Sequence, residues 1–156
     1  MPSPSRRTVL RATAWSVPVV SVVATAPAFA ASAPGSPVLA LALSEGPAPD
    51  PAMRRVTVSA TNPSTSPLEL TVVMPWHAAG GSQLFEVDYG SGWAFVGDGT
   101  IVTGWLTVAP STTAPSFWVD YVVPAGVSED ITLTLSAPGF DSVAAVVTLR
   151  STAPPA

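Results

Sequence analysis

Hydrophobic and polar residues alternate at every second position along most of the chain beyond residue 52. The cleanest run is 131–136, where isoleucine and leucine alternate with threonine and serine, and the same period recurs at 56–60 and 68–74. Side chains of a strand point to opposite faces in turn, so each run predicts a β-strand with one buried face. The 18 prolines are too densely scattered for a long helix.

Residues that favour turns separate these runs at short intervals. The segment Asn-Pro-Ser-Thr-Ser-Pro occupies 62–67, while Gly-Ser-Gly and Gly-Asp-Gly occupy 90–92 and 97–99. The two glycine-flanked reversals predict a three-stranded meander over 82–108.

The first strand of this meander has hydrophobic residues at alternate positions, which predicts that they share one face. These residues are Phe85, Val87 and Tyr89. Ahead of the meander, the segment 32–51 is rich in Ala, Pro, Gly and Ser. It predicts a flexible start, one strand at 38–43 and a loop at 45–51.

Eight or nine short strands between polar turns, over about a hundred residues, predict an all-β fold built as an antiparallel β-sandwich. Residues 37–150 resemble bacterial immunoglobulin-like surface domains. The resemblance rests on the Val-x-Val-x-Ala-x-Asn-Pro pattern at 56–63, which runs into Leu-x-Leu at 68–70, and on the Pro-Ser passage within 108–119. It implies an immunoglobulin-like topology, and a jelly roll is the alternative.

The first thirty residues follow a different pattern, with a basic start, a moderately apolar stretch at 12–27 and a site of small residues. The basic start resembles a twin-arginine (Tat) export signal of actinobacterial secreted proteins. Its matching residues are Ser5, Arg6, Arg7 and Leu10, with Arg11 in place of the usual lysine. The small-residue site lies at Ala28, Ala30 and Ala31.

The resemblance implies that the leader engages the Tat machinery and a signal peptidase. We therefore expect a signal peptide at 1–30, a flexible mature start at 31–36, the sandwich at 37–150 and a disordered tail at 151–156. The protein is then exported, and is extracellular or associated with the cell wall, with no membrane span after cleavage. A retained anchor over 12–31 is the alternative.

The net charge of the chain limits the classes of partner that it can bind. Without the leader, three arginines stand against ten acidic residues, a net charge of −7, and the chain has no lysine. Such a surface has no positive patch for phosphates, so the sequence excludes nucleic-acid binding. The chain has no cysteine either, so no disulfide supports the fold and no thiolate is present to bind a metal or cofactor.

Catalytic chemistry has few candidates. His77 is the only histidine, and no Gly-x-Ser-x-Gly elbow accompanies it. Glu86 and Asp88 repeat at the spacing that places two carboxylates on one strand face, but a solvated polar face has the same pattern. Acidic turns at Asp98, 129–130 and Asp141 lack a calcium-loop motif. The sequence therefore predicts no cofactor and no enzyme activity.

Aromatic residues give the best candidate for a binding site. The period of each strand predicts that Trp93 belongs to the core, while Trp105 and Trp118 lie on polar strand faces and Trp76 lies in a loop. Exposed flat rings can stack on sugars, although rings also close the ends of sandwiches. These residues, Trp76, Trp105 and Trp118, are the predicted ligand patch.

Four functional hypotheses follow. The first is a secreted, non-catalytic module that binds a protein at the surface or cell wall. The second is a carbohydrate-binding protein that uses the exposed tryptophans. A filament subunit joined through strand edges and a hydrolase are the remaining alternatives.

Overall fold

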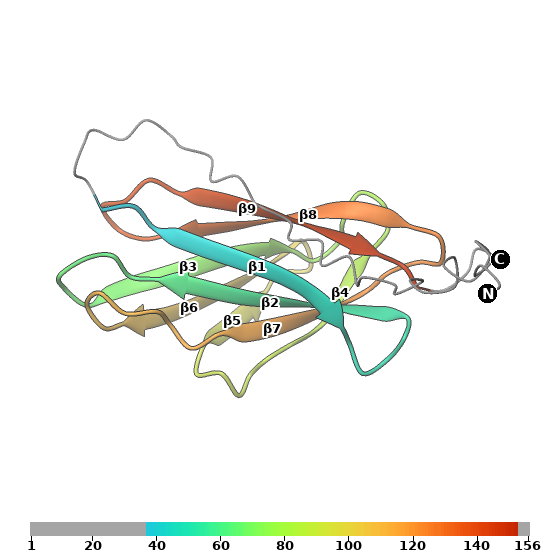
Figure 1. Ribbon diagram of the computed structural model, residues 1–156, viewed down its shortest axis with the longest axis horizontal. Helices are drawn as coiled ribbons and strands as arrows, with labels where there is room; N and C mark the ends of the chain where they lie inside the picture. Colours follow the sequence, from blue (N-terminus) through green and yellow to red (C-terminus); the bar gives the residue numbers. More distant parts are fainter. Residues whose placement is uncertain (1–36, 153–156) are drawn as a thin grey trace, which may run out of the picture. The chain divides into compact units, whose positions relative to one another are not determined.

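The computed structural model describes residues 37–152, which form nine β-strands and no helix (Figure 1). The strands are β1 (Ala40–Pro47), β2 (Met53–Thr61), β3 (Leu68–Pro75), β4 (Gln83–Val87), β5 (Ala94–Gly97), β6 (Ile101–Val108), β7 (Phe117–Val122), β8 (Ser128–Ser136) and β9 (Val143–Arg150). Within these residues, no helix has the length and apolar character of a membrane span. The segments predicted as a leader, a mature start and most of the tail lie outside the described residues.

The strands form two antiparallel sheets, one of four strands in the order β1-β2-β7-β4 and one of five in the order β5-β6-β3-β8-β9. Their inner faces pack together, which confirms the predicted sandwich. The first order matches A-B-E-D of an immunoglobulin constant domain, and β9-β8-β3 matches G-F-C. The hairpin β5–β6 extends the second sheet beyond β3, and the chain enters it after β4.

Inward-facing residues of both sheets make one core. Val56 and Val58 of β2, with Leu70 and Val72 of β3, have no exposed surface, as the alternation predicts. Burying an aliphatic side chain of this size contributes about 1.5–3 kcal/mol, so these alternating residues supply much of the driving force for folding. Tyr121 is also buried, and its hydroxyl donates to the carbonyl of Pro75 across the sheets at 3.0 Å.

The structure corrects two local predictions. Strand β1 continues to Pro47, through the first part of the expected loop at 45–51. The segment 82–108 is not a meander, because β4 pairs with β7 in one sheet whereas β5 and β6 belong to the other. The chain crosses between the sheets after β4, and the glycine-rich turn at 90–92 permits this crossing as readily as a hairpin.

The predicted alternation in β4 also fails, because a β-bulge shifts its register between Leu84 and Glu86. Leu84 and Val87 are buried, whereas Phe85 is 62% exposed. Tyr89, which was expected to share the face of Val87, is 73% exposed. The rings of Phe85 and Tyr89 therefore project into solvent at this edge of the sandwich.

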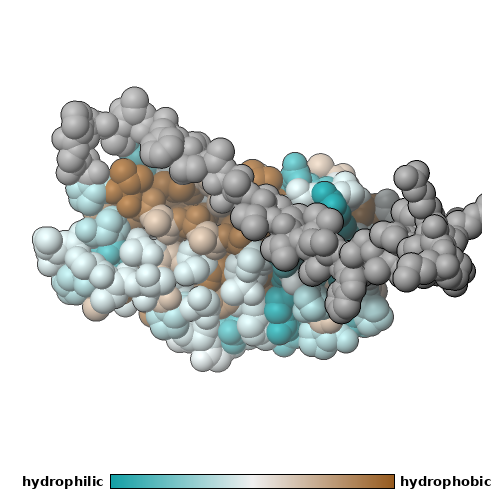
Figure 2. All heavy atoms as spheres, viewed as in Figure 1, coloured by the Kyte–Doolittle hydropathy of each residue, from teal (hydrophilic) through white to brown (hydrophobic). Residues whose placement is uncertain are grey.

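The two lateral sides of the sandwich differ. On one side β1 and β9 lie close together, and Arg54 donates to the carbonyl of Arg150 at 2.6 Å and pairs with Glu45 at 3.2 Å. Figure 2 shows apolar side chains gathered along this side. On the other side the edge strands β4 and β5 are separated by a hollow.

Candidate functional site

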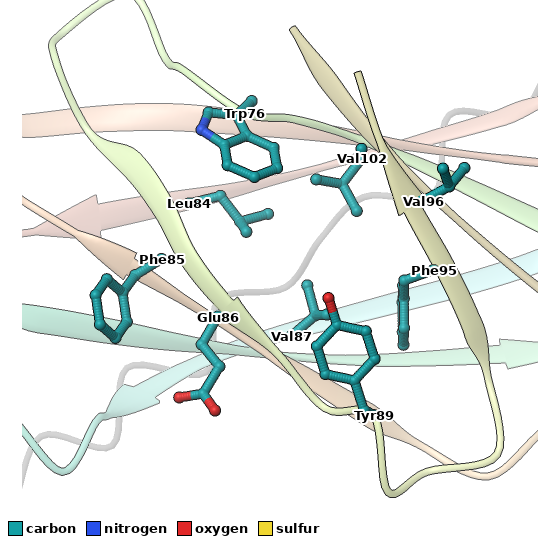
Figure 3. Close-up of a pocket in the computed structure, with 10 residues that line it drawn as sticks. Trp76, Leu84, Phe85, Glu86, Val87, Tyr89, Phe95, Val96 and Val102 are labelled. Carbon is teal, nitrogen blue, oxygen red and sulfur yellow. The ribbon is translucent and has the colours of Figure 1, made fainter. Parts of the chain in front are cut away.

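The hollow lies between the edge strands of the two sheets and has a volume of about 110 Å³. We call it the aromatic hollow, because four of its ten lining residues are aromatic; the ten are Trp76, Leu84, Phe85, Glu86, Val87, Tyr89, Phe95, Val96, Gly97 and Val102. Figure 3 shows Tyr89 and Phe95 side by side across the hollow from Trp76. The volume is well below the roughly 300–1,000 Å³ of clefts that enclose a drug-sized ligand. The hollow is therefore suited to a ring or substituent of a larger molecule.

A hydrogen-bonded turn after β4 holds Tyr89. The carboxylate of Asp88 accepts the backbone N–H of Gly90 at 3.0 Å, and the hydroxyl of Ser91 donates to the carbonyl of Asp88 at 2.8 Å. The ring of Tyr89 stands at 90° to that of Phe95, with 5.9 Å between centroids. Edge-to-face pairs of this kind contribute about 0.5–1.5 kcal/mol. The exposed ring of Tyr89 is thus held in a fixed orientation.

Phe95 connects the hollow to the core. Its ring packs against that of Phe117, with 5.2 Å between centroids, and the Phe117 ring packs against that of buried Trp93, with 4.9 Å between centroids. The prediction that Trp93 is a core residue is confirmed. Its indole N–H donates to the carbonyl of Pro115 at 2.9 Å, which satisfies its polar atom. The wall of the hollow therefore rests on a rigid aromatic stack.

Trp76 enters the hollow from the segment between β3 and β4. Its backbone N–H donates to the backbone carbonyl of Thr100 at 2.9 Å, and its own carbonyl accepts the backbone N–H of Leu84 at 2.9 Å. A methyl group built on Gly97 would lie 2.6 Å from the indole ring, so only glycine allows β5 to approach the ring this closely. Trp76 is half-buried and forms one wall of the hollow.

The loop after Trp76 is fastened to β8 by a carboxylate. Glu129 accepts the backbone N–H groups of Gly80 and, at 2.8 Å, of Ser82. Hydrogen bonds to a charged acceptor contribute about 1.5–3 kcal/mol when buried and less at this partly exposed position. The acidic pair at 129–130, considered above as a calcium site, thus has a structural role at Glu129.

Phe85 and Glu86 lie at the rim of the hollow. Figure 3 shows both side chains leaving β4 on the side away from Trp76. The bulge places Phe85 in solvent, and Glu86 pairs in register with Asp120 of β7, so its side chain extends over the outer face of the four-stranded sheet. A ligand that extends out of the hollow across β4 would meet this ring and this carboxylate.

The three predicted patch residues do not form one surface, and this corrects the prediction. Trp105 lies on β6 and points to the outer face of the five-stranded sheet, where it is 36% exposed. Trp118 lies on β7, on the outer face of the four-stranded sheet. The sequence placed both on polar strand faces, but it did not show that β6 and β7 belong to different sheets. Of the three, Trp76 lines the hollow.

Trp118 belongs to a group that we call the Arg55 cluster, which consists of Arg55, Trp118 and Asp120. The guanidinium of Arg55 lies 3.8 Å from the centroid of the Trp118 ring. It also donates two hydrogen bonds to the buried carboxylate of Asp120, at 2.8 and 2.7 Å. The bonds to Asp120 hold the pKa of Arg55 above its ordinary value. Every charged group of the cluster therefore has a partner.

The remaining candidates are surface or turn residues. His77 is exposed and forms an isolated bridge with Gln83. Asp98 accepts the N–H groups of Thr100 and Ile101 at 2.8 and 2.9 Å. Over residues 37–152 no group of three or more His, Asp or Glu side chains is placed to bind a metal. The residues of the predicted signal motif and cleavage site lie outside the described part of the chain.

Sequence reasoning missed Tyr89 and Phe85 as site residues. Their alternation with Val87 indicated one buried face, and the bulge that breaks this period has no glycine to mark it. The turn residues after Tyr89 were visible, because Gly-Ser-Gly follows it directly. That Tyr89 lies beside Phe95 could not be seen, because the contact depends on the crossing between sheets.

No protein-family model matches the chain, and no curated protein matches it in sequence. Among solved structures, it is similar to the chitin-binding domain of Chi18aC from Streptomyces coelicolor, with 16% identity and a TM-score of 0.44 over 62% of this chain and 90% of that one. It is also similar to a DUF4466 family protein from Parabacteroides merdae, with 13% identity and a TM-score of 0.45. That likeness covers 76% of this chain and 45% of the other. Neither similarity indicates a function. The strand order of the two sheets defines the fold class as an immunoglobulin-like β-sandwich.

Proposed function

We propose that this protein is a non-catalytic carbohydrate-binding module and that the aromatic hollow is its ligand site. The observation that carries the proposal is the pair of exposed rings, Tyr89 and Phe85, at the mouth of a hollow lined by Trp76 and Phe95. The C–H faces of a sugar ring pack on flat aromatic rings, and polar groups at the rim accept its hydroxyl hydrogens. The small volume of the hollow suits one unit of a polymer.

A protein partner that adds a strand beside the hollow is less well supported, because the two edge strands there, β4 and β5, are short or irregular. Strand β4 carries the bulge at Phe85, and β5 has four residues. Short, bulged edges are features with which proteins prevent strand addition. The same reasoning counts against a filament joined through these edges. Solvent-exposed rings beside a short or bulged edge strand favour a ligand that stacks on the rings. They do not favour a partner that forms hydrogen bonds with the strand backbone.

We propose further that the protein acts outside the cell. This rests on the twin-arginine leader, whose residues lie outside the described part of the chain. Replacing both Arg6 and Arg7 by lysine tests it. We expect the protein to accumulate inside the cell, whereas unchanged export would reject the Tat route.

The test of the binding function is retention of the full chain on cellulose, chitin and peptidoglycan. We expect retention on at least one of these polymers. Tyr89→Ala should weaken it about 10-fold, which corresponds to about 1.4 kcal/mol. Because Tyr89 is 73% exposed, the same change should lower the free energy of unfolding by no more than about 0.5–1.5 kcal/mol, the contribution of its edge-to-face contact with Phe95.

Trp105→Ala is the matched control, because it removes an exposed ring from a different surface. We expect its retention to equal that of the unaltered chain. Absence of retention on all three polymers would reject the proposed function. Equal weakening by Tyr89→Ala and Trp105→Ala would place the site elsewhere.

A further inference from the structure

We propose that the glycan bound at the aromatic hollow carries free amino groups, and that Glu86 is the residue that selects them. This inference rests on the proposed function and specifies its ligand class. Two independent features support it: the aromatic lining of the hollow, and the charge of the groups around it.

The rings themselves favour a cation. Aromatic faces attract an ammonium group within about 6 Å of the ring centroid, even at exposed sites. Tyr89, Phe95 and Trp76 line one small hollow from different directions. A protonated amine on a sugar that stacks there would lie near several rings, whereas a neutral acetamide would gain no comparable electrostatic attraction.

The charges at the rim have the matching sign. Glu86 is the only charged residue that lines the hollow, its side chain is exposed, and it takes part in neither ion pair found within residues 37–152. The candidate counter-ion for Glu86 is Arg55. The negative charge of Glu86 helps to raise the pKa of Arg55, but the guanidinium donates its two hydrogen bonds to Asp120. The rim is therefore negative.

The other two arginines of the described residues do not reverse this sign. Arg54 is buried at the β1–β9 side, where it pairs with Glu45. Arg150 ends β9, and neither residue lines the hollow. A polymer that extends from the hollow across β4 would thus carry its amines past Glu86, while the charge of Arg55, on the same outer face, is matched by Asp120.

The test compares the affinities of the full chain for hexamers of β-1,4-linked glucosamine and of N-acetylglucosamine by titration calorimetry. The titration is carried out at a pH of about 5.5, so that the amines of the glucosamine hexamer are protonated. We expect the glucosamine hexamer to bind about fivefold more tightly at low salt. Glu86→Gln should reduce this preference, because it lowers the affinity for the glucosamine hexamer more than the affinity for the acetylated hexamer.

Glu69→Gln is the matched control, because Glu69 is an exposed glutamate on β3 that does not line the hollow. It should keep the preference. Equal binding of the two hexamers, or tighter binding of the acetylated one, would overturn the inference and leave the proposed function standing. If neither hexamer binds and the three polymers above do not retain the chain, the proposed function itself fails.

Oligolysine of similar length serves as a non-carbohydrate probe. If it matches the glucosamine hexamer and its binding is insensitive to Tyr89→Ala, the attraction is one of charge alone, and the inference is overturned. If oligolysine binds more weakly, and Tyr89→Ala weakens the binding of the glucosamine hexamer about 10-fold, stacking and charge act together as proposed.

Discussion

The Arg55 cluster and the aromatic hollow both present aromatic rings beside β4, but their rings have different partners. In the cluster, Trp118 is covered by a guanidinium that is itself fixed by the buried carboxylate of Asp120. In the hollow, Tyr89 contacts Phe95 by one edge and leaves most of its surface to solvent. A ring covered by a fixed guanidinium stabilises the fold, whereas a ring that is held in place and mostly exposed is available to a ligand.

The largest expected effect tests the structural role of the cluster. Asp120→Ala removes a buried carboxylate that accepts two hydrogen bonds from Arg55. We expect the free energy of unfolding to fall by about 2–3 kcal/mol, which is less than the roughly 3–5 kcal/mol for breaking a fully buried ion pair, because Arg55 retains access to water. Urea denaturation measures this loss. Glu86→Ala, which breaks no ion pair, is the control, and a similar loss there would contradict the comparison.

A second prediction tests the rigidity of the hollow. In Gly97→Ala the added methyl group would lie 2.6 Å from the ring of Trp76. Because the ring must move, we expect a loss of about 1–3 kcal/mol in thermal or urea unfolding, together with weaker glycan retention. Gly46→Ala is the control, since nothing lies within 4 Å of its added methyl group. Unchanged retention in Gly97→Ala would mean that the position of Trp76 does not matter for binding.

The smallest expected effect is on stability at low pH and involves Asp98. Backbone N–H groups of Ile101 and Thr100 hold the pKa of Asp98 below its ordinary value in the turn that joins β5 to β6. A lowered folded-state pKa stabilises the fold above the unfolded value of about 3.9, and this share is lost as pH falls through the folded value. We expect Asp98→Asn to reduce the fall in melting temperature between about pH 4 and pH 2. An identical fall in both proteins would show that this turn does not respond to acid.

Much of the fold could be predicted because strand period and burial agree. Val56, Val58, Leu70 and Val72 are buried as their alternation indicates, and Asn62 forms the expected turn, with its amide donating to the carbonyls of Ser66 and Val108 at 2.9 Å. These features depend on neighbouring residues, which the sequence displays directly.

The candidate site could be predicted only in part. Trp76 was identified from its loop, but Trp105 and Trp118 were assigned to the same patch. Their separation follows from the membership of β6 and β7 in different sheets. Pairing between distant strands leaves no mark on the local period, so the faces that meet in space could not be derived from it.

The sequence by itself determined an all-β sandwich, an acidic surface and the absence of any cysteine, because these follow from composition and from a period of two residues. Only the tertiary structure decided that β4 and β5 border a hollow and that the bulge turns Phe85 outward. It also placed Arg55 against Asp120 across 65 residues of sequence. The physical reason is that the ring contacts and the ion pair join residues on different strands, and strand pairing is fixed by the packing of the whole core.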